Sequence, residues 1–103
     1  MTMLQPGLLP AHQAIVRAIL QAHLPEGAKI WIFGSRARGT TKKYADLDLA
    51  VDAGHRLPLR DLIELEDAFV QSDLPFKVDI VDWENIDPGF ARAIEADRLL
   101  LLV

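Results

Sequence analysis

The feature that most restricts the fold of this chain is a regular alternation of two periodicities along its 103 residues. Apolar residues recur at helical spacing in some segments, and β-branched or aromatic residues form short runs in others. Helices are expected from Pro10 to just before Pro25 and at residues 35–39, 58–71 and 88–97, and strands at residues 29–33, 46–52 and 77–82. This alternation predicts an α+β (alternating α/β) fold, with a small mixed sheet of three or four strands packed against helices.

The helix at 58–71 and the last residues of the sequence lead to more detailed expectations. In the helix at 58–71, the apolar positions predict a core-facing side, made up of Leu59, Leu62, Ile63, Phe69 and Val70. The apolar residues 99–103 form either an edge strand or a docked tail. An uncovered apolar edge at this tail would be an association site for a further subunit.

Length and composition narrow the class of protein further. The length suits a single domain spanning residues 1–103, and half of the residues are hydrophobic. The net charge of -4 argues against direct binding of nucleic acid, and the absence of cysteine excludes disulfides and thiolate metal sites. No apolar run reaches the roughly 18 residues of a membrane span, and the first residues do not resemble a signal peptide. A cytoplasmic domain is therefore expected.

An acidic pair stands at the start of the predicted strand at 46–52. Asp46 and Asp48 are two positions apart, so their side chains project to the same face of a strand. Two carboxylates this close repel each other, whereas a divalent cation such as Mg²⁺ would reverse that cost. The pair therefore indicates either a metal platform or two ordinary acids on a solvent-facing surface.

The loop before this pair has features of a phosphate-binding turn. Gly34 and Ser35 follow a strand and precede a short helix, where glycine lets backbone approach a ligand and free amides attract anions. On its own, Gly-Ser could equally be a routine helix cap. Four cations follow, which could contact phosphate or form a solvated basic loop: Arg36, Arg38, Lys42 and Lys43.

A third acid, Asp79, lies in the middle of the predicted strand at 77–82. If this strand neighbours the one that carries Asp48, Asp79 could complete a cluster of three carboxylates. The alternative is a salt bridge to Lys77, which lies on the same face. Asp52 and Asp82 are rival acids, but each stands at a strand end, where acids are unremarkable.

Taken together, Gly34-Ser35, ten further residues, Asp46-x-Asp48 and the later Asp79 resemble the signature of the DNA polymerase β-like nucleotidyltransferase superfamily. The stretch IWIFGSRARGTTKKYADLDLAV is similar to its minimal nucleotidyltransferase branch in particular. The resemblance implies the nucleotidyltransferase fold. It also implies that Asp46, Asp48 and Asp79 hold two Mg²⁺ ions, with Asp79 also deprotonating or orienting the acceptor hydroxyl.

For the nucleotide, the resemblance implies that Gly34 and Ser35 bind the β- and γ-phosphates of a nucleoside triphosphate, most simply ATP. Arg36 or Arg38 would stabilise charge on the departing pyrophosphate. A two-metal site of this kind clamps the attacking and leaving oxygens of an in-line displacement, and positioning and charge neutralisation supply most of the catalysis.

The minimal branch resembles the antitoxin half of toxin–antitoxin pairs whose toxin is a HEPN ribonuclease. The resemblance thus implies an antitoxin that transfers AMP from ATP to a tyrosine hydroxyl of the toxin. Larger superfamily members carry extra domains for the acceptor, so a partner protein is expected to bring it here. Two alternatives remain: a catalytically silent antitoxin that acts by contact alone, and a small-molecule transferase of the aminoglycoside type.

Overall fold

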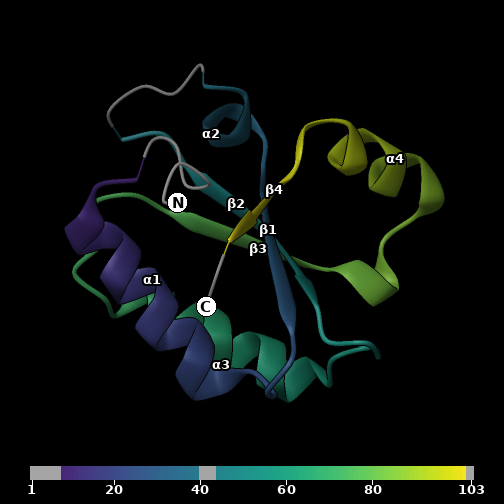
Figure 1. Cartoon of the computed structure of the whole chain (residues 1–103). Coiled ribbons are helices and arrows are strands. Elements are labelled where there is room, and N and C mark those ends of the chain that lie inside the picture. The colour runs from purple at the N-terminus through teal and green to yellow at the C-terminus, as the bar shows by residue number, and fades with distance from the viewer. Residues whose placement is uncertain (1–7, 40–43, 102–103) are drawn as a thin grey trace.

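A computed structural model of the chain describes residues 8–39 and 44–101, which form a four-stranded mixed sheet packed with helices (Figure 1). Along the chain the elements are α1 (Pro10–His23), β1 (Lys29–Phe33), α2 (Ser35–Arg38), β2 (Leu47–Asp52), α3 (Leu59–Val70), β3 (Val78–Asp82), the 3-10 helix η1 (Trp83–Asn85), α4 (Pro88–Asp97) and β4 (Leu99–Leu101). The predicted α+β class and mixed sheet are confirmed.

The order of the strands in the sheet is β3-β2-β1-β4. β1 runs antiparallel to both β2 and β4, whereas β2 and β3 are parallel. Parallel neighbours need a crossover connection, and here that connection contains α3. The C-terminal segment is therefore an edge strand over Leu99–Leu101; residues 102–103 lie outside the described part of the chain.

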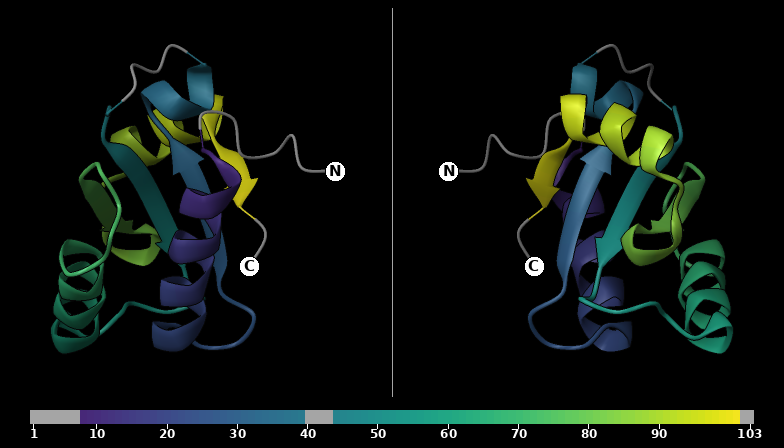
Figure 2. Two further views of the ribbon diagram at one scale, coloured as in Figure 1. Left: turned by 90° about the vertical axis from the view of Figure 1, so that its left-hand side faces the viewer. Right: turned by 90° about the vertical axis from the view of Figure 1, so that its right-hand side faces the viewer.

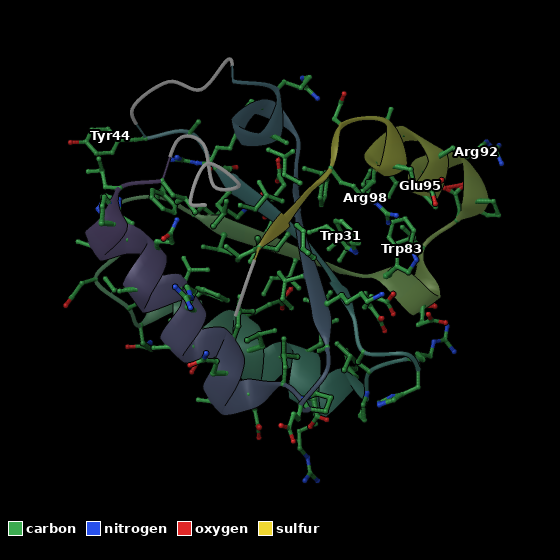
Figure 3. All side chains as sticks on the ribbon, in the orientation of Figure 1. Trp31, Tyr44, Trp83, Arg92, Glu95 and Arg98 are labelled. Carbon is green, nitrogen blue, oxygen red and sulfur yellow. The ribbon has the colours of Figure 1, made fainter. Side chains whose placement is uncertain are left out.

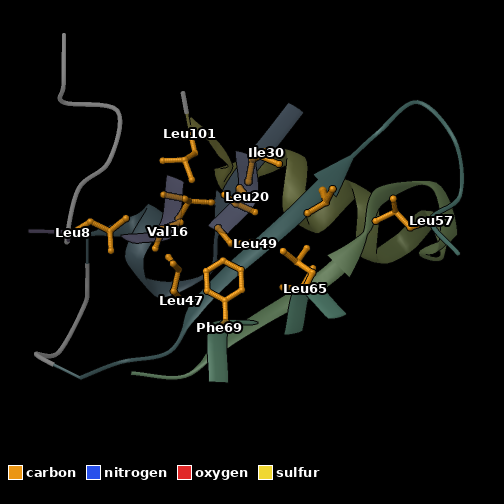
Figure 4. Packing of buried hydrophobic residues seen from close by; sticks show 13 residues of the cluster. Leu8, Val16, Leu20, Ile30, Leu47, Leu49, Leu57, Leu65, Phe69 and Leu101 are labelled. Atoms are coloured by element: carbon orange, nitrogen blue, oxygen red, sulfur yellow. The ribbon is translucent and has the colours of Figure 1, made fainter. Parts of the chain in front are cut away.

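Helices cover the two faces of this sheet unequally. Figure 2 shows α1 on one side of the sheet and α4 on the other. The main core lies on the α1 side, where side chains of α1 and α3 meet the inward positions of the strands (Figure 4). Its fully buried members include Val16, Leu20, Ile30, Leu49 and Leu65. On the opposite face, α4 covers only a part of the sheet, and the acidic side chains described below lie there.

The buried side of α3 differs from the predicted one. Leu65 and Phe69 are buried and Leu62 packs against them, but Leu59, Ile63 and Val70 are 71%, 52% and 76% exposed. At about 100° per residue, Leu59, Ile63 and Val70 form their own stripe, turned away from Leu65 and Phe69. The prediction merged two apolar stripes, and packing against the sheet selects only one of them.

The two tryptophans lie on the α4 side of the sheet. In Figure 3, Trp31 of β1 and Trp83 of η1 stand beside Arg98, which follows α4. The Arg98 guanidinium carbon is 4.0 Å from the ring centroid of Trp31 and 4.9 Å from that of Trp83. Such cation–π contacts each contribute on the order of 1 kcal/mol. They tie the end of α4 to the sheet, so both tryptophans serve in packing.

Within residues 8–39 and 44–101, none of the helices has the length and apolar character that crossing a membrane requires.

Asp82, considered above as a rival third acid, is instead a buried capping residue. Its carboxylate accepts hydrogen bonds from the backbone N–H of Leu57 at 2.7 Å and of Glu84 at 3.1 Å. Only 5% of the residue is exposed. Asp82 thereby joins the loop before α3 to the start of η1.

Replacing Asp82 by alanine should lower the free energy of unfolding by about 1–3 kcal/mol, because a buried backbone N–H loses its acceptor. Urea denaturation at neutral pH measures this change. Asp52→Ala is the matched control, since the bond that Asp52 accepts from the Gly54 N–H, at 3.0 Å, is exposed. If both variants lose the same free energy of unfolding, the buried hydrogen bonds of Asp82 have no special role in stability.

Candidate functional site

Three side chains lie side by side across the sheet on the face that α4 only partly covers. In the strand register, Phe33 of β1 pairs with Asp48 of β2, and Asp48 pairs with Asp79 of β3. Residues paired in this way share a face of the sheet. The parallel β2–β3 pairing therefore places Asp79 beside Asp48, as the three-carboxylate interpretation requires.

Gly34, the residue after β1, approaches the Asp48 carboxylate closely. A Cβ atom at position 34 would overlap Asp48 Oδ2, at a separation that real Cβ atoms do not show. The backbone of Gly34 also has φ 77° and ψ -153°, a region that is essentially restricted to glycine. Both facts show that the turn is shaped around the carboxylate of Asp48, so the turn and the acidic pair form one site.

The environment of Asp48 disfavours its negative charge. Burial raises the pKa of the Asp48 carboxyl above its usual range, and the neighbouring carboxylates of Asp79 and Asp46 raise it further. Arg38 acts in the opposite direction, as the smallest of the four effects. The site therefore carries concentrated negative charge, which a bound cation would stabilise.

The three aspartates share this region without forming a closed cage. Asp46, the first residue of the strand predicted at 46–52, is exposed and lies one residue before the observed β2. Asp79 Oδ1 is 3.4 Å from Lys77 Nζ, so the salt bridge considered above is also present. Across the described residues, no group of three His, Cys, Asp or Glu side chains is arranged to hold one metal ion.

The chemistry of these groups nevertheless suits a hard divalent cation. Mg²⁺ is usually held by one or two carboxylates together with phosphate oxygens and water, and a complete cage of protein ligands is unusual for it. Here Asp46 and Asp48 offer two carboxylates, and the backbone of Gly34 lies directly against the carboxylate of Asp48. A cation at this position would also offset the charge repulsion that raises the pKa of Asp48.

Arg38 stands at the edge of the site. Its guanidinium is exposed and lies 3.3 Å from Asp97 Oδ2, near the end of α4. The same region contains a small pocket of about 240 Å³, lined in part by Gly34, Phe33 and Phe90. The rings of Phe33 and Phe90 meet edge to face at 5.9 Å. Arg38 is thus within reach of a ligand that contacts the Gly34 turn.

The other residues that were predicted to contact phosphate are less exposed than Arg38 or lie outside the described residues. Ser35 is the first residue of α2 and is partly buried. Arg36 is only 2% exposed, and its guanidinium donates to the backbone carbonyl of Ala45. The structure does not bring Arg36 to the open surface beside Arg38. Lys42 and Lys43 lie outside the described residues.

Sequence reasoning did not single out Phe76, whose ring lies against the Arg36 guanidinium, 4.3 Å from centroid to carbon. Nothing in the spacing of residues 36, 45 and 76 connects them. No signal in the sequence indicated this contact, because the enclosed surroundings of Arg36 arise only when the chain has folded.

Comparisons with known proteins show the family to which the chain belongs. Residues 16–102 match the family model described as "Polymerase beta, Nucleotidyltransferase". A Haemophilus influenzae protein called "Probable protein adenylyltransferase MntA" is 43% identical over 81 residues, which cover 79% of this chain and 70% of that protein. The chain belongs to the polymerase β nucleotidyltransferase family.

Solved structures show the same fold. A crystal structure of a toxin–antitoxin with AMP-PNP aligns with a TM-score of 0.74 and 26% identity, covering 87% of this chain and 72% of that one. A complex of the tri-AMPylated Shewanella oneidensis HEPN toxin with an MNT antitoxin aligns with a TM-score of 0.68 and 23% identity, covering 87% and 68% of the two chains. At that identity, the second likeness supports the fold alone.

Proposed function

We propose that this chain transfers AMP from ATP to a hydroxyl group of a partner protein, and that the partner is a HEPN toxin that the modification silences. The observation that carries this proposal is the pairing of Asp48 with Asp79 on one open face, directly against the Gly34 turn. The relative from Haemophilus influenzae, named as a protein adenylyltransferase, supports the reaction type. The AMP-PNP complex of a similar toxin–antitoxin supports ATP as the donor.

In this reaction the acceptor oxygen forms a bond to the α-phosphorus of ATP. The bond from that phosphorus to the oxygen bridging to the β-phosphate breaks, and pyrophosphate leaves. We assign the hydroxyl proton to Asp79, whose side chain stands at the open edge of the sheet. Gly34 and Ser35 would bind the β- and γ-phosphates through backbone N–H and hydroxyl donors. Arg38 would stabilise charge on pyrophosphate.

Two Mg²⁺ ions are proposed as cofactors, held by Asp46, Asp48 and Asp79 together with the triphosphate. When bound, they would supply neutralisation of the charge that develops around the α-phosphate. The protein would contribute the fixed positions of its carboxylates, since positioning and electrostatics provide most of the catalysis in phosphoryl transfer. The cytoplasm, where ATP is abundant, is the compartment that we propose for this reaction.

A tyrosine hydroxyl is the proposed acceptor, and labelled ATP tests it directly. The chain, Mg²⁺ and a purified HEPN toxin should give radioactive toxin from ATP labelled at the α-phosphate and none from ATP labelled at the γ-phosphate. Mass spectrometry should then place each added AMP on tyrosine. Omission of Mg²⁺ should abolish labelling.

A second result would favour the contact-only antitoxin instead. If the ribonuclease activity of the toxin is suppressed while no label is transferred at any Mg²⁺ concentration, the chain neutralises by binding. The Lys77–Asp79 salt bridge is the observation that keeps this alternative in view, because it already gives Asp79 a partner. Label on a small-molecule alcohol but never on protein would contradict both forms of antitoxin.

A further inference from the structure

The side chain of Arg36 connects three segments that the candidate site needs. Arg36 belongs to α2, directly after the Gly34-Ser35 turn. Its Nε and Nη2 atoms both donate to the carbonyl oxygen of Ala45, at 3.1 and 2.7 Å. Its guanidinium also lies over the ring of Phe76, which precedes β3. One side chain of α2 therefore contacts both the approach to Asp46 and the approach to the strand of Asp79.

The burial of this arginine indicates a structural purpose. Arg36 is among the largest side chains that are almost completely enclosed, at 2% exposure. Burial lowers the pKa of its guanidinium, while Asp46 nearby opposes that change. A buried charge is costly unless it is well hydrogen-bonded, so its contacts must be well matched. A planar guanidinium can donate in the plane and stack on an aromatic face at the same time, whereas lysine cannot.

The carbonyl that Arg36 binds belongs to the peptide unit between Ala45 and Asp46. Because a peptide unit is planar, fixing the carbonyl of Ala45 also fixes the N–H of Asp46 and the direction in which the chain enters that residue. Asp46 itself is exposed and lies just before β2. The N–H of the next residue, Leu47, donates to the Lys77 carbonyl at 2.9 Å, so the bond from Arg36 restrains the peptide on the other side of Asp46. Without the contact from Arg36, Asp46 would lose a main restraint on its backbone.

We infer that Arg36 is a positioning residue for nucleotidyl transfer: lying against the Phe76 ring, its guanidinium holds Asp46 in place beside Asp48 by donating to the Ala45 carbonyl. This inference rests on the proposed function. It assigns Arg36 a task other than the direct contact with phosphate that the sequence resemblance implies, and Arg38 keeps that contact. The physical cause is preorganisation, because misplacing a catalytic group by about 1 Å can lower a rate by about a hundredfold.

The test compares Arg36→Lys with Arg60→Lys, the same change at an exposed position of α3. For Arg36→Lys we expect a kcat for transfer at least about tenfold lower, an Mg²⁺ requirement about tenfold higher, and a KM for ATP changed less than about threefold. Arg60→Lys should match the wild type. A higher KM for ATP and weaker pyrophosphate inhibition, with an unchanged Mg²⁺ requirement, would show phosphate contact and overturn the inference.

A binding measurement keeps this test independent of transfer activity. Mn²⁺ titrated into the chain with AMP-PNP, followed by electron paramagnetic resonance, should show about tenfold weaker binding for Arg36→Lys than for the wild type. If the wild-type chain binds Mn²⁺ and AMP-PNP but labels no protein, the proposed function fails. The Mn²⁺ affinity of Arg36→Lys then still shows whether Arg36 positions the metal-binding carboxylate. Unchanged Mn²⁺ binding and kcat, with only a lower melting temperature, would reduce Arg36 to a folding residue.

Phe76→Leu provides a milder second variant in case Arg36→Lys does not fold. It removes the aromatic face under the guanidinium and leaves both donors to Ala45 intact, so it should weaken Mn²⁺ binding in the same direction by a smaller factor. The double variant should lose less than the product of the two single effects, because both substitutions disturb one contact. Full multiplicativity would show that the two side chains act separately.

Discussion

Replacing Asp48 by asparagine is expected to abolish most AMP transfer and, at the same time, to stabilise the metal-free chain. The loss of activity should be on the order of a thousandfold, because charge neutralisation by a metal is worth several kcal/mol and each 1.4 kcal/mol or so corresponds to a factor of ten. The labelled-ATP assay measures this loss. Asp67→Asn, the same change on the exposed side of α3, should leave transfer unaffected.

The gain in stability follows from the raised pKa of Asp48. A carboxyl whose pKa is higher in the folded chain favours folding when it is protonated. That contribution is complete below its ordinary pKa and is lost as the pH rises through the raised value. The melting temperature of Asp48→Asn should therefore exceed that of the wild type at neutral pH without Mg²⁺, and the difference should vanish in acid.

Mg²⁺ with AMP-PNP should reverse this order of stability. A ligand that binds only the folded chain stabilises it, and Asp48→Asn should gain less from that ligand than the wild type does. Differential scanning calorimetry with and without Mg²⁺ and AMP-PNP checks both halves of the prediction. A variant that melts below the wild type in the absence of metal would mean that Asp48 is a structural acid, and the metal-site interpretation would be wrong.

Replacing Gly34 by alanine is expected to impair both the fold and the reaction. The backbone conformation of Gly34 costs an alanine about 1–3 kcal/mol. The added Cβ would also occupy the place of Asp48 Oδ2, so the carboxylate has to turn away. Transfer should fall about a hundredfold, as expected for a catalytic group displaced by about an ångström.

Gly27→Ala is the matched control for this substitution. Gly27 also has a positive φ, of 89°, but a Cβ there would meet nothing within 4 Å. We expect Gly27→Ala to lower the melting temperature through backbone strain while leaving kcat unchanged. Equal losses of transfer in both variants, at a temperature where both are folded, would show that the collision with Asp48 is unimportant.

Much of this site could be predicted because its parts are local in the chain. Gly34, Ser35, Asp46 and Asp48 lie within fifteen residues, and strand periodicity alone assigns Asp46 and Asp48 to one face. Asp79 could be proposed only on the condition that its strand neighbours β2. The observed register, in which Asp48 pairs with Asp79, meets that condition.

The errors arose where packing had to choose between equivalent local options. The apolar positions of α3 form two stripes, and the sheet buries the one that contains Leu65 and Phe69 while leaving Leu59 and Val70 exposed. Periodicity reports that a helix has apolar positions, but the orientation of the helix depends on the surface it meets. Arg36 shows the same limit, since its partner Ala45 lies nine residues further on and its partner Phe76 lies in the segment before β3.

The order of residues by itself determined the alternation of elements, the glycine turn and the spacing of the acidic pair, because these depend on periods and backbone preferences that act over a few residues. Tertiary structure alone decided that Asp79 stands beside Asp48, that Asp82 caps a buried loop, and that Arg36 is enclosed between Ala45 and Phe76. These outcomes depend on which strands pair and which side chains lose contact with water, and both are settled only when the whole sheet has formed.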